Sequence, residues 1–172
     1  MYRLILFRHA KASSPEGVED HERPLDPSGV RAAPVMARWL AQQGMVPDLA
    51  LVSPSLRTKE TWALAAPAFE ASIRLRFEAS LYEARVSTIF SLIRSTASDV
   101  NTLILVGHNP GLEDVAGQLA GVAGSAARQR LAAGFPPGSI AVLECPIDRW
   151  DELRPGAAEL THAVTPADLK AA

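Results

Sequence analysis

The chain has 172 residues, with 17 Lys and Arg against 19 Asp and Glu, a formal net charge of −2, and 48% apolar residues. This composition excludes a disordered or fibrous chain and suffices for one hydrophobic core, so we expect a single domain over residues 1–172. The near-neutral charge gives no broad electrostatic attraction to nucleic acid or to an anionic membrane. The one cysteine, Cys145, excludes an internal disulfide framework and a thiolate metal cluster, and it is typical of a reducing compartment.

The N-terminal segment does not have the pattern of a targeting sequence. Its apolar run covers only residues 4–7 and ends at Arg8 and His9. A signal peptide needs an apolar stretch of ~7–15 residues, and a membrane helix needs ~20. We therefore expect a cytoplasmic protein that binds neither membrane nor nucleic acid.

Short apolar runs alternate with longer segments of helical spacing along the chain. The apolar runs predict strands at residues 4–7, 49–52, 73–77, 103–106, 139–144 and 159–163. The helical spacing predicts helices at residues 28–43, from Ser53-Pro54 to Ala66, at 86–98 and after Pro110. The strand at 73–77 alternates with period two and should have one polar face. This order predicts an α/β fold, a three-layer sandwich with a mainly parallel central sheet flanked by helices on both faces.

Two irregular segments interrupt this alternation. A polar loop covers residues 10–27, and a Gly/Pro-rich stretch covers residues 132–138. Loops longer than a simple connection are often functional.

Two predicted strands end in the same way. The first reads LILFRHA and the fourth LILVGHN, which places His9 and His108 at the same offset after a Leu-Ile-Leu run. If these strands are parallel neighbours, both imidazoles lie at the carboxyl edge of the sheet. Open α/β folds bind their ligands at that edge.

An arginine follows the second predicted strand at a helix start. Arg57 lies in the first turn, where free N–H groups and the helix dipole already favour an anion. Its planar guanidinium suits phosphate oxygens. Together with Arg8, His9 and His108 it predicts a compact cationic pocket for a dianionic phosphoryl group.

Three segments together resemble the signatures of a known family. They are Arg8-His9-Ala10, Ser53-Pro54-Ser55-Leu56-Arg57-Thr58 and Gly107-His108-Asn109-Pro110-Gly111. In this order they are similar to the histidine phosphatase superfamily (phosphoglycerate-mutase-like). The segments at residues 20–25, 81–84 and 150–169 are similar to its SixA-type phosphohistidine phosphatase branch, so the resemblance covers nearly the whole chain.

The resemblance implies a covalent mechanism that requires no metal and no other cofactor. His9 would attack phosphorus in line and form a phosphohistidine intermediate that water cleaves. Arg8, Arg57 and His108 would hold the equatorial oxygens and neutralise their charge. The nucleophile must be neutral, so its other nitrogen should donate to a backbone carbonyl or similar acceptor.

Further positions follow from the resemblance less directly. Glu83 occupies the region where larger family members have an acid that protonates the leaving group, but it is equally well a solvated loop residue. The branch often has serine where this chain has Ala12, which suggests that Ser13 supplies a hydroxyl to the phosphate. Asn109, in the third signature, is a further candidate phosphate ligand.

Other side chains are weaker candidates. Asp20 and Arg23 either border the site or hold the polar loop, and His21 and His162 have no clear partner. Cysteine-dependent phosphatases have five residues between their cysteine and arginine, and the Cys145-Pro-Ile-Asp-Arg segment has three. We therefore expect Cys145 to be a buried apolar residue.

Three functions remain open. The favoured substrate is a phosphorylated protein, for instance a phosphohistidine-bearing signalling domain. The alternative is a phosphatase of small phosphate monoesters, because a short chain without lid insertions should have an open site. A third hypothesis, from a different class, is a non-catalytic module that binds phosphate or a phosphoprotein.

Overall fold

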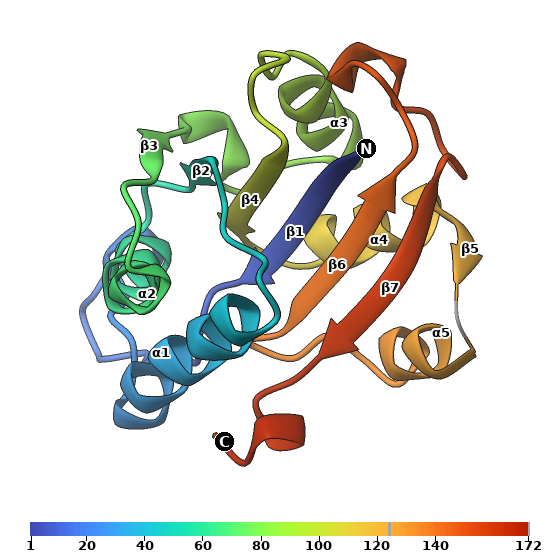
Figure 1. Cartoon of the computed structure of the whole chain (residues 1–172). Coiled ribbons are helices and arrows are strands. Elements are labelled where there is room, and N and C mark those ends of the chain that lie inside the picture. The colour runs from blue at the N-terminus through green and yellow to red at the C-terminus, as the bar shows by residue number, and fades with distance from the viewer. Residues whose placement is uncertain (124, 172) are drawn as a thin grey trace.

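The computed structural model describes residues 1–123 and 125–171, which form a seven-stranded sheet between two layers of helices (Figure 1). The strands are β1 (Tyr2–Arg8), β2 (Leu49–Val52), β3 (Arg74–Phe77), β4 (Thr102–Gly107), β5 (Ala120–Ala123), β6 (Ile140–Cys145) and β7 (Ala158–Val164). Their order is β3-β2-β4-β1-β6-β7-β5. β6 pairs antiparallel with β1 and β7, and the other pairs are parallel. The predicted α/β fold with a mainly parallel sheet is confirmed.

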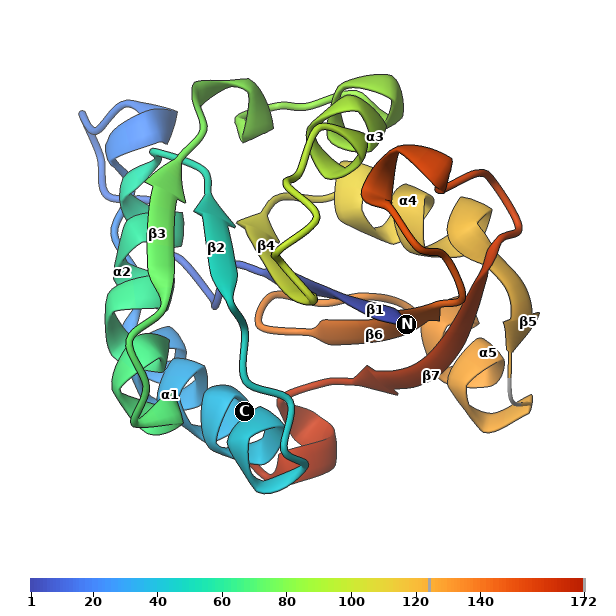
Figure 2. The same ribbon diagram turned by 45° about the horizontal axis from the view of Figure 1, so that its top comes forward.

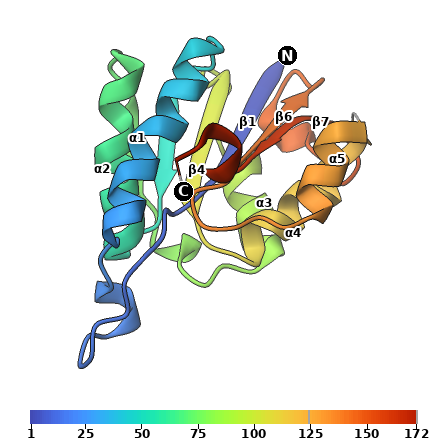
Figure 3. The ribbon, with the colours of Figure 1, turned by 90° about the horizontal axis from the view of Figure 1, so that it is seen from below.

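Helices cover both faces of the sheet (Figure 3). One layer contains α1 (Pro27–Gln42) and α2 (Leu56–Ala65), and the other contains α3 (Val86–Arg94), α4 (Gly111–Leu119) and α5 (Ser125–Ala132). Short 3₁₀ turns lie at Asp20–Glu22, Ala66–Phe69, Ala79–Leu81, Trp150–Glu152 and Ala167–Leu169. The three-layer arrangement is therefore the predicted one.

The central strands are buried on both faces, which explains their continuous apolar runs. In β1, Leu4 and Leu6 pack into the core under α3 and α4, while Ile5 and Phe7 pack into the core under α1 and α2. All four side chains are fully buried. Because its side chains alternate between the two cores, β1 is held at the centre of the molecule. This position also fixes the residues that follow β1.

Two helix boundaries differ from the prediction. The helix after β2 begins at Leu56, with Ser55 at its N-cap. The Thr58 hydroxyl lies 2.6 Å from the Ser53 carbonyl oxygen and holds Ser53 and Pro54 outside the helix as a turn. The helix predicted for 86–98 ends at Arg94, where the Ser95 and Thr96 hydroxyls bond back to the Leu92 carbonyl.

The sheet edges also differ from the prediction. β3 has the predicted polar face with Arg74 and Arg76, but its apolar residues Leu75 and Phe77 are exposed too, since β3 lies at the end of the strand order (Figure 2). β5 and α5 were not predicted, because the Ala- and Gly-rich sequence there has no clear apolar period. Among the described residues we find no helix with the length and apolar character that crossing a membrane requires.

Candidate active site

The two matching strand ends lie side by side. β1 and β4 are parallel neighbours in a register that pairs Phe7 with Val106 and Arg8 with Gly107. His9 and His108 follow these pairs, and their ring centroids are 5.4 Å apart. The two similar strand sequences are thus aligned side by side in the sheet. This alignment brings both imidazoles to one point on the carboxyl edge of the sheet.

His9 has one ring nitrogen engaged and one free for chemistry. Nδ1 lies 2.7 Å from the carbonyl oxygen of Ala10, which can only accept, so Nδ1 carries the proton and Nε2 keeps its lone pair. The Ala10 amide donates to the Thr61 hydroxyl at 3.0 Å and fixes this carbonyl in place. Burial lowers the pKa of His9 to about 4, assisted by the guanidinium groups of Arg57 and Arg8 and opposed by the Ala10 carbonyl. His9 is therefore neutral at neutral pH.

His108 is held at both nitrogens. Nε2 lies 2.7 Å from the Ser53 hydroxyl, and Nδ1 lies 3.5 Å from Nη2 of Arg57, at the limit of hydrogen-bond distance. Because a guanidinium only donates, Nδ1 accepts and Nε2 donates to Ser53. Burial lowers the pKa of His108 to about 3, and the neighbouring His9 and Arg57 add to the shift.

Arg57 is buried and held by the polar loop. Its side chain is 7% exposed, with Nη1 donating to the Asp20 carbonyl oxygen at 2.6 Å and Nη2 donating to the Asp20 carboxylate at 3.1 Å. The same carboxylate accepts hydrogen bonds from the Tyr82 hydroxyl and from Arg23. The Tyr82 hydroxyl, then Arg23 and Arg57, hold the pKa of Asp20 well below its usual range. The 10–27 loop thus reaches the site through a charged network.

The second irregular segment also supports the site. Nη1 of Arg8 donates to the Phe135 carbonyl oxygen at 2.8 Å, and the amide nitrogen of Asn109 donates to the same oxygen at 3.1 Å. Within the described part of the chain, the Nε atoms of Arg8 and Arg57 are buried and have no hydrogen-bond partner. Buried donors without a partner are rare, and two of them in one site fit an anion.

These groups line one pocket of about 340 Å³. Its lining residues are Arg8, His9, Lys11, Ala12, Asp20, Arg23, Arg57, Glu83, His108, Asn109 and Pro137. Of the seven residues given catalytic or phosphate-binding roles from the sequence, six line this pocket and Ser13 does not. The weaker candidates Asp20 and Arg23 also line it. Ser13 instead bonds through its backbone to Pro24 and Arg23, and its suggested phosphate contact stays a prediction.

Sequence reasoning missed two side chains that hold the site together. Ser53 is fully buried and bonds His108, and Tyr82 bonds Asp20 and packs its ring edge-on to His108 at 5.5 Å. Ser53 lies in the second signature segment, but the sequence pattern predicts it only as the start of a helix. Tyr82 lies beside Glu83, and no pattern in the sequence marks its hydroxyl.

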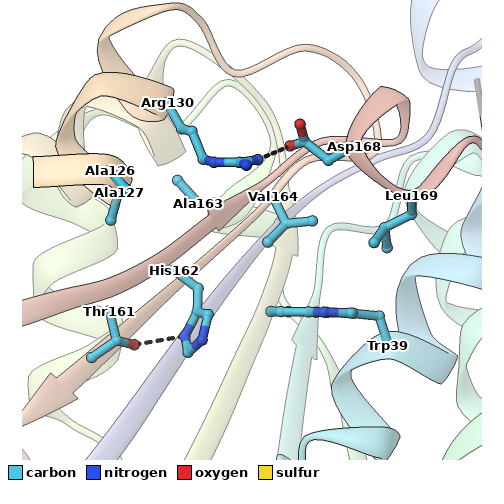
Figure 4. Close-up of a pocket in the computed structure, with 10 residues that line it drawn as sticks. All are labelled: Trp39, Ala126, Ala127, Arg130, Thr161, His162, Ala163, Val164, Asp168 and Leu169. Atoms are coloured by element: carbon cyan, nitrogen blue, oxygen red, sulfur yellow. Dashed lines mark hydrogen bonds and ion pairs between the residues drawn. The ribbon is translucent and has the colours of Figure 1, made fainter. Parts of the chain in front are cut away.

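The other weaker candidates, His162, His21 and Cys145, do not line this pocket. His162 lies in a separate pocket between α1 and β7, where its ring packs against Trp39 at a centroid distance of 5.4 Å (Figure 4). His21 packs edge-on to Tyr82 at 4.8 Å, next to the active-site network. Cys145 is fully buried in the core, and burial raises the pKa of its thiol to about 12, which confirms that it is an inert apolar residue.

Comparisons with known proteins agree with this geometry. The model of the histidine phosphatase superfamily (branch 1) matches residues 4–89. An uncharacterized protein of Mycobacterium tuberculosis is 35% identical over 159 residues, which cover 90% of this chain and 96% of that protein.

Two solved structures are similar over almost their whole length. SixA of Nakamurella multipartitia has 32% identity and a TM-score of 0.81, with 96% of each chain covered. SixA of Agrobacterium tumefaciens has 30% identity and the same TM-score, with 96% of this chain and 98% of that chain covered. The chain therefore belongs to the histidine phosphatase superfamily and is a SixA-like, histidine-dependent phosphatase.

Proposed function

We propose that this phosphatase works through a covalent phosphohistidine on His9, without a metal ion, and that its substrate is phosphohistidine on a protein. One observation carries the covalent mechanism. The bond from Nδ1 of His9 to the Ala10 carbonyl leaves Nε2 with its lone pair, inside a pocket with several cationic side chains.

The reaction has two displacements at phosphorus. In the first, the lone pair of Nε2 forms a P–N bond while the bond from phosphorus to the leaving group breaks, and the leaving group keeps that electron pair and takes up a proton. In the second, water attacks phosphorus, the P–Nε2 bond breaks, and inorganic phosphate leaves with neutral His9 restored. Both steps pass through a charge-rich transition state that fixed cations stabilise.

Guanidinium groups supply the positive charge that such a transition state needs. Arg8 and Arg57 line the pocket, and their guanidinium groups are donors for the equatorial oxygens. His108 borders the same pocket, and because its Nδ1 accepts from Arg57, its imidazole helps to position that guanidinium. We therefore expect full activity after dialysis against a strong chelator, and a loss that added Mg²⁺ or Zn²⁺ restores would contradict the metal-free mechanism.

Three considerations support phosphohistidine as the substrate. Transfer from a substrate imidazole to His9 exchanges one P–N bond for another, so the first step is close to thermoneutral. The SixA proteins of Nakamurella multipartitia and Agrobacterium tumefaciens are described as proposed phosphohistidine phosphatases. A departing imidazole also demands little from an acid catalyst.

Trapping the intermediate tests this proposal. A phosphohistidine protein labelled with ³²P is mixed with the enzyme and quenched in base, where phosphohistidine is stable. We expect an acid-labile label on the wild type and on His162→Ala, a matched control histidine outside the pocket. His9→Ala should carry no label, and unchanged hydrolysis in that variant would refute the mechanism. Binding of phosphoprotein without label or turnover would instead indicate the non-catalytic module.

Glu83 favours a second candidate, the hydrolysis of small monoesters. Glu83 lines the pocket, and its backbone has the left-handed conformation with φ of 53°, which costs a residue with a side chain roughly 1–2 kcal/mol. Strain at such a position is typical of functional sites, and an alkoxide leaving group needs an acid at this place.

Glu83→Gln distinguishes the two candidates. If Glu83 protonates the leaving group, hydrolysis of a monoester with a poor leaving group should fall by about 10²-fold, and hydrolysis of phosphohistidine should change far less. Equal losses for both substrates would remove this role from Glu83.

A further inference from the structure

Two neighbouring pockets share lining residues with the catalytic pocket. On the side of α3 and α4, Glu83, His108 and Asn109 also line a pocket that contains the charged residues Arg85 and Asp114. On the side of α1, Lys11 and Pro137 also line a groove of about 350 Å³, which we call the proline groove. Apolar residues dominate its walls: Ala32, Pro136, Pro137, Pro166, Ala167 and Ala171.

The walls of the proline groove are fixed to the backbone around the nucleophile. Gly138 donates its N–H to the His9 carbonyl at 2.8 Å, and a Cβ at this position, where φ is +85°, would lie 2.8 Å from the Pro166 ring. A Cβ on Gly29 would lie 2.2 Å from the Lys11 carbonyl oxygen. Glycine at these two positions allows the 132–138 segment, the end of the chain and the start of α1 to approach one another closely. The groove is therefore built into the same backbone that positions His9.

Chemistry favours a hydrocarbon group as the occupant. Proline and alanine have almost no side-chain entropy to lose on binding. A sugar or another polar group in such a groove would lose its hydrogen bonds to water and gain only contacts with apolar carbon, which costs free energy. The proline groove thus suits an apolar side chain that lies close to the phosphoryl group.

We propose that the proline groove binds an apolar side chain of the substrate protein, one helical turn away from the phosphohistidine. This inference rests on the proposed function. Residues three or four apart on a helix lie ~5–6 Å from each other, so a helix that places its phosphohistidine at His9 can place such a neighbour in the adjoining pocket. Lys11 and Pro137 line both pockets, so the groove lies directly beside the catalytic pocket. Substrate choice then depends on the residue next to the phosphohistidine as well as on the phosphoryl group.

The test combines helical phosphohistidine peptides with charge variants of the groove. The peptides have one leucine three or four residues before or after the phosphohistidine, and each has an asparagine counterpart. Phosphoramidate, which has no side chain, reports on the catalytic pocket alone. Ala167→Glu and Ala171→Glu each place a carboxylate at the groove. Ala71→Glu is the matched control. Ala71 is exposed and lies just before the amino end of β3, whereas the catalytic pocket lies at the carboxyl edge of the sheet.

We expect the wild type to hydrolyse one leucine peptide with a kcat/KM about tenfold above that of its asparagine counterpart. Ala167→Glu and Ala171→Glu should remove this preference and leave phosphoramidate hydrolysis within twofold, while Ala71→Glu should change neither. Equal wild-type rates for all peptides, or a preference that survives both groove variants, would overturn the inference alone. A wild type that cleaves monoesters and phosphoramidate but no phosphohistidine peptide would overturn the proposed function, and the inference with it.

Discussion

The two strand ends that meet in the active site have nearly the same sequence and very different surroundings. His9 follows β1 and donates from Nδ1 to the carbonyl of the next residue, Ala10, which leaves Nε2 unbonded. His108 follows β4 at the same level, but it is fixed between the Ser53 hydroxyl and Arg57. One imidazole is free to form a bond, and the other is fixed as part of the pocket wall.

This difference in contacts is the basis for the different roles that we propose for the two histidines. Both histidines are neutral because burial lowers both pKa values. Their roles depend instead on what each ring nitrogen contacts. A nitrogen with an unshared lone pair can act as a nucleophile, whereas an imidazole held at both nitrogens can orient and polarise a substrate. The following predictions test that division, from the largest expected effect to the smallest.

The largest effect should come from removing the free imidazole. His9→Ala should lower kcat on a phosphohistidine protein by about 10⁴-fold or more, because the other histidine that lines the pocket, His108, has both ring nitrogens engaged. Single-turnover kinetics would measure this loss. Circular dichroism should show an unchanged fold, because His9 is not part of either apolar core. A variant with more than a tenth of wild-type kcat would show that the two histidines do not differ in role.

Removing the fixed imidazole should cost less. His108→Ala should lower kcat by roughly 10²–10³-fold, the range for losing one group that helps to stabilise the transition state, because Arg57 then loses the imidazole that positions it. The variant should still acquire the ³²P label, more slowly, because His9 remains. Rapid-quench labelling would follow this rate, and a complete absence of label after long incubation would contradict the division of roles.

Ser53→Ala tests whether the position of His108 matters. The hydroxyl is fully buried and holds Nε2, so we expect a loss of about 3–10-fold in kcat/KM, equivalent to one hydrogen bond of roughly 0.5–1.5 kcal/mol. Ser53 acts only through His108 in this scheme. Adding Ser53→Ala to His108→Ala should therefore change nothing further, and additive losses would point to a separate role for the hydroxyl.

The smallest difference between the histidines should appear in their titration. The folded pKa values lie at about 4 for His9 and about 3 for His108, below the ~6.5 of an unperturbed imidazole. Both rings should therefore remain neutral at pH 5.5, and His9 should lose its free lone pair only as the pH falls through about 4. The same shifts make the fold less stable as the pH falls below ~6.5, since the unfolded chain then binds more protons.

NMR titration of the two Cε1–H groups measures these values directly. Chemical denaturation at pH 7 and pH 5 provides the stability comparison, and His9→Asn should show a weaker pH dependence than the wild type. Titration of either ring near pH 6.5 in the folded protein would contradict the role of burial.

The sequence alone determined the layout of the fold and much of the pocket. The continuous apolar runs of β1, β2 and β4 indicated strands that are buried on both faces. A strand with one face in water would instead alternate apolar and polar residues. The two matched histidines then implied a shared edge, and the register of β1 and β4 confirms it. Arg8 and Arg57 could be placed beside them because strand ends and helix starts occupy predictable positions in α/β folds.

Tertiary structure alone decided what each of these groups contacts. Tyr82 and Asp20 meet across 62 positions of the chain, and Arg8 meets the Phe135 carbonyl across 127, so no local pattern encodes either contact. The unbonded Nε2 of His9 and the apolar groove beside it depend on the same long-range packing. Local periodicity specifies which segments form strands and helices, whereas a hydrogen bond or a pocket depends on where several distant segments come together in space.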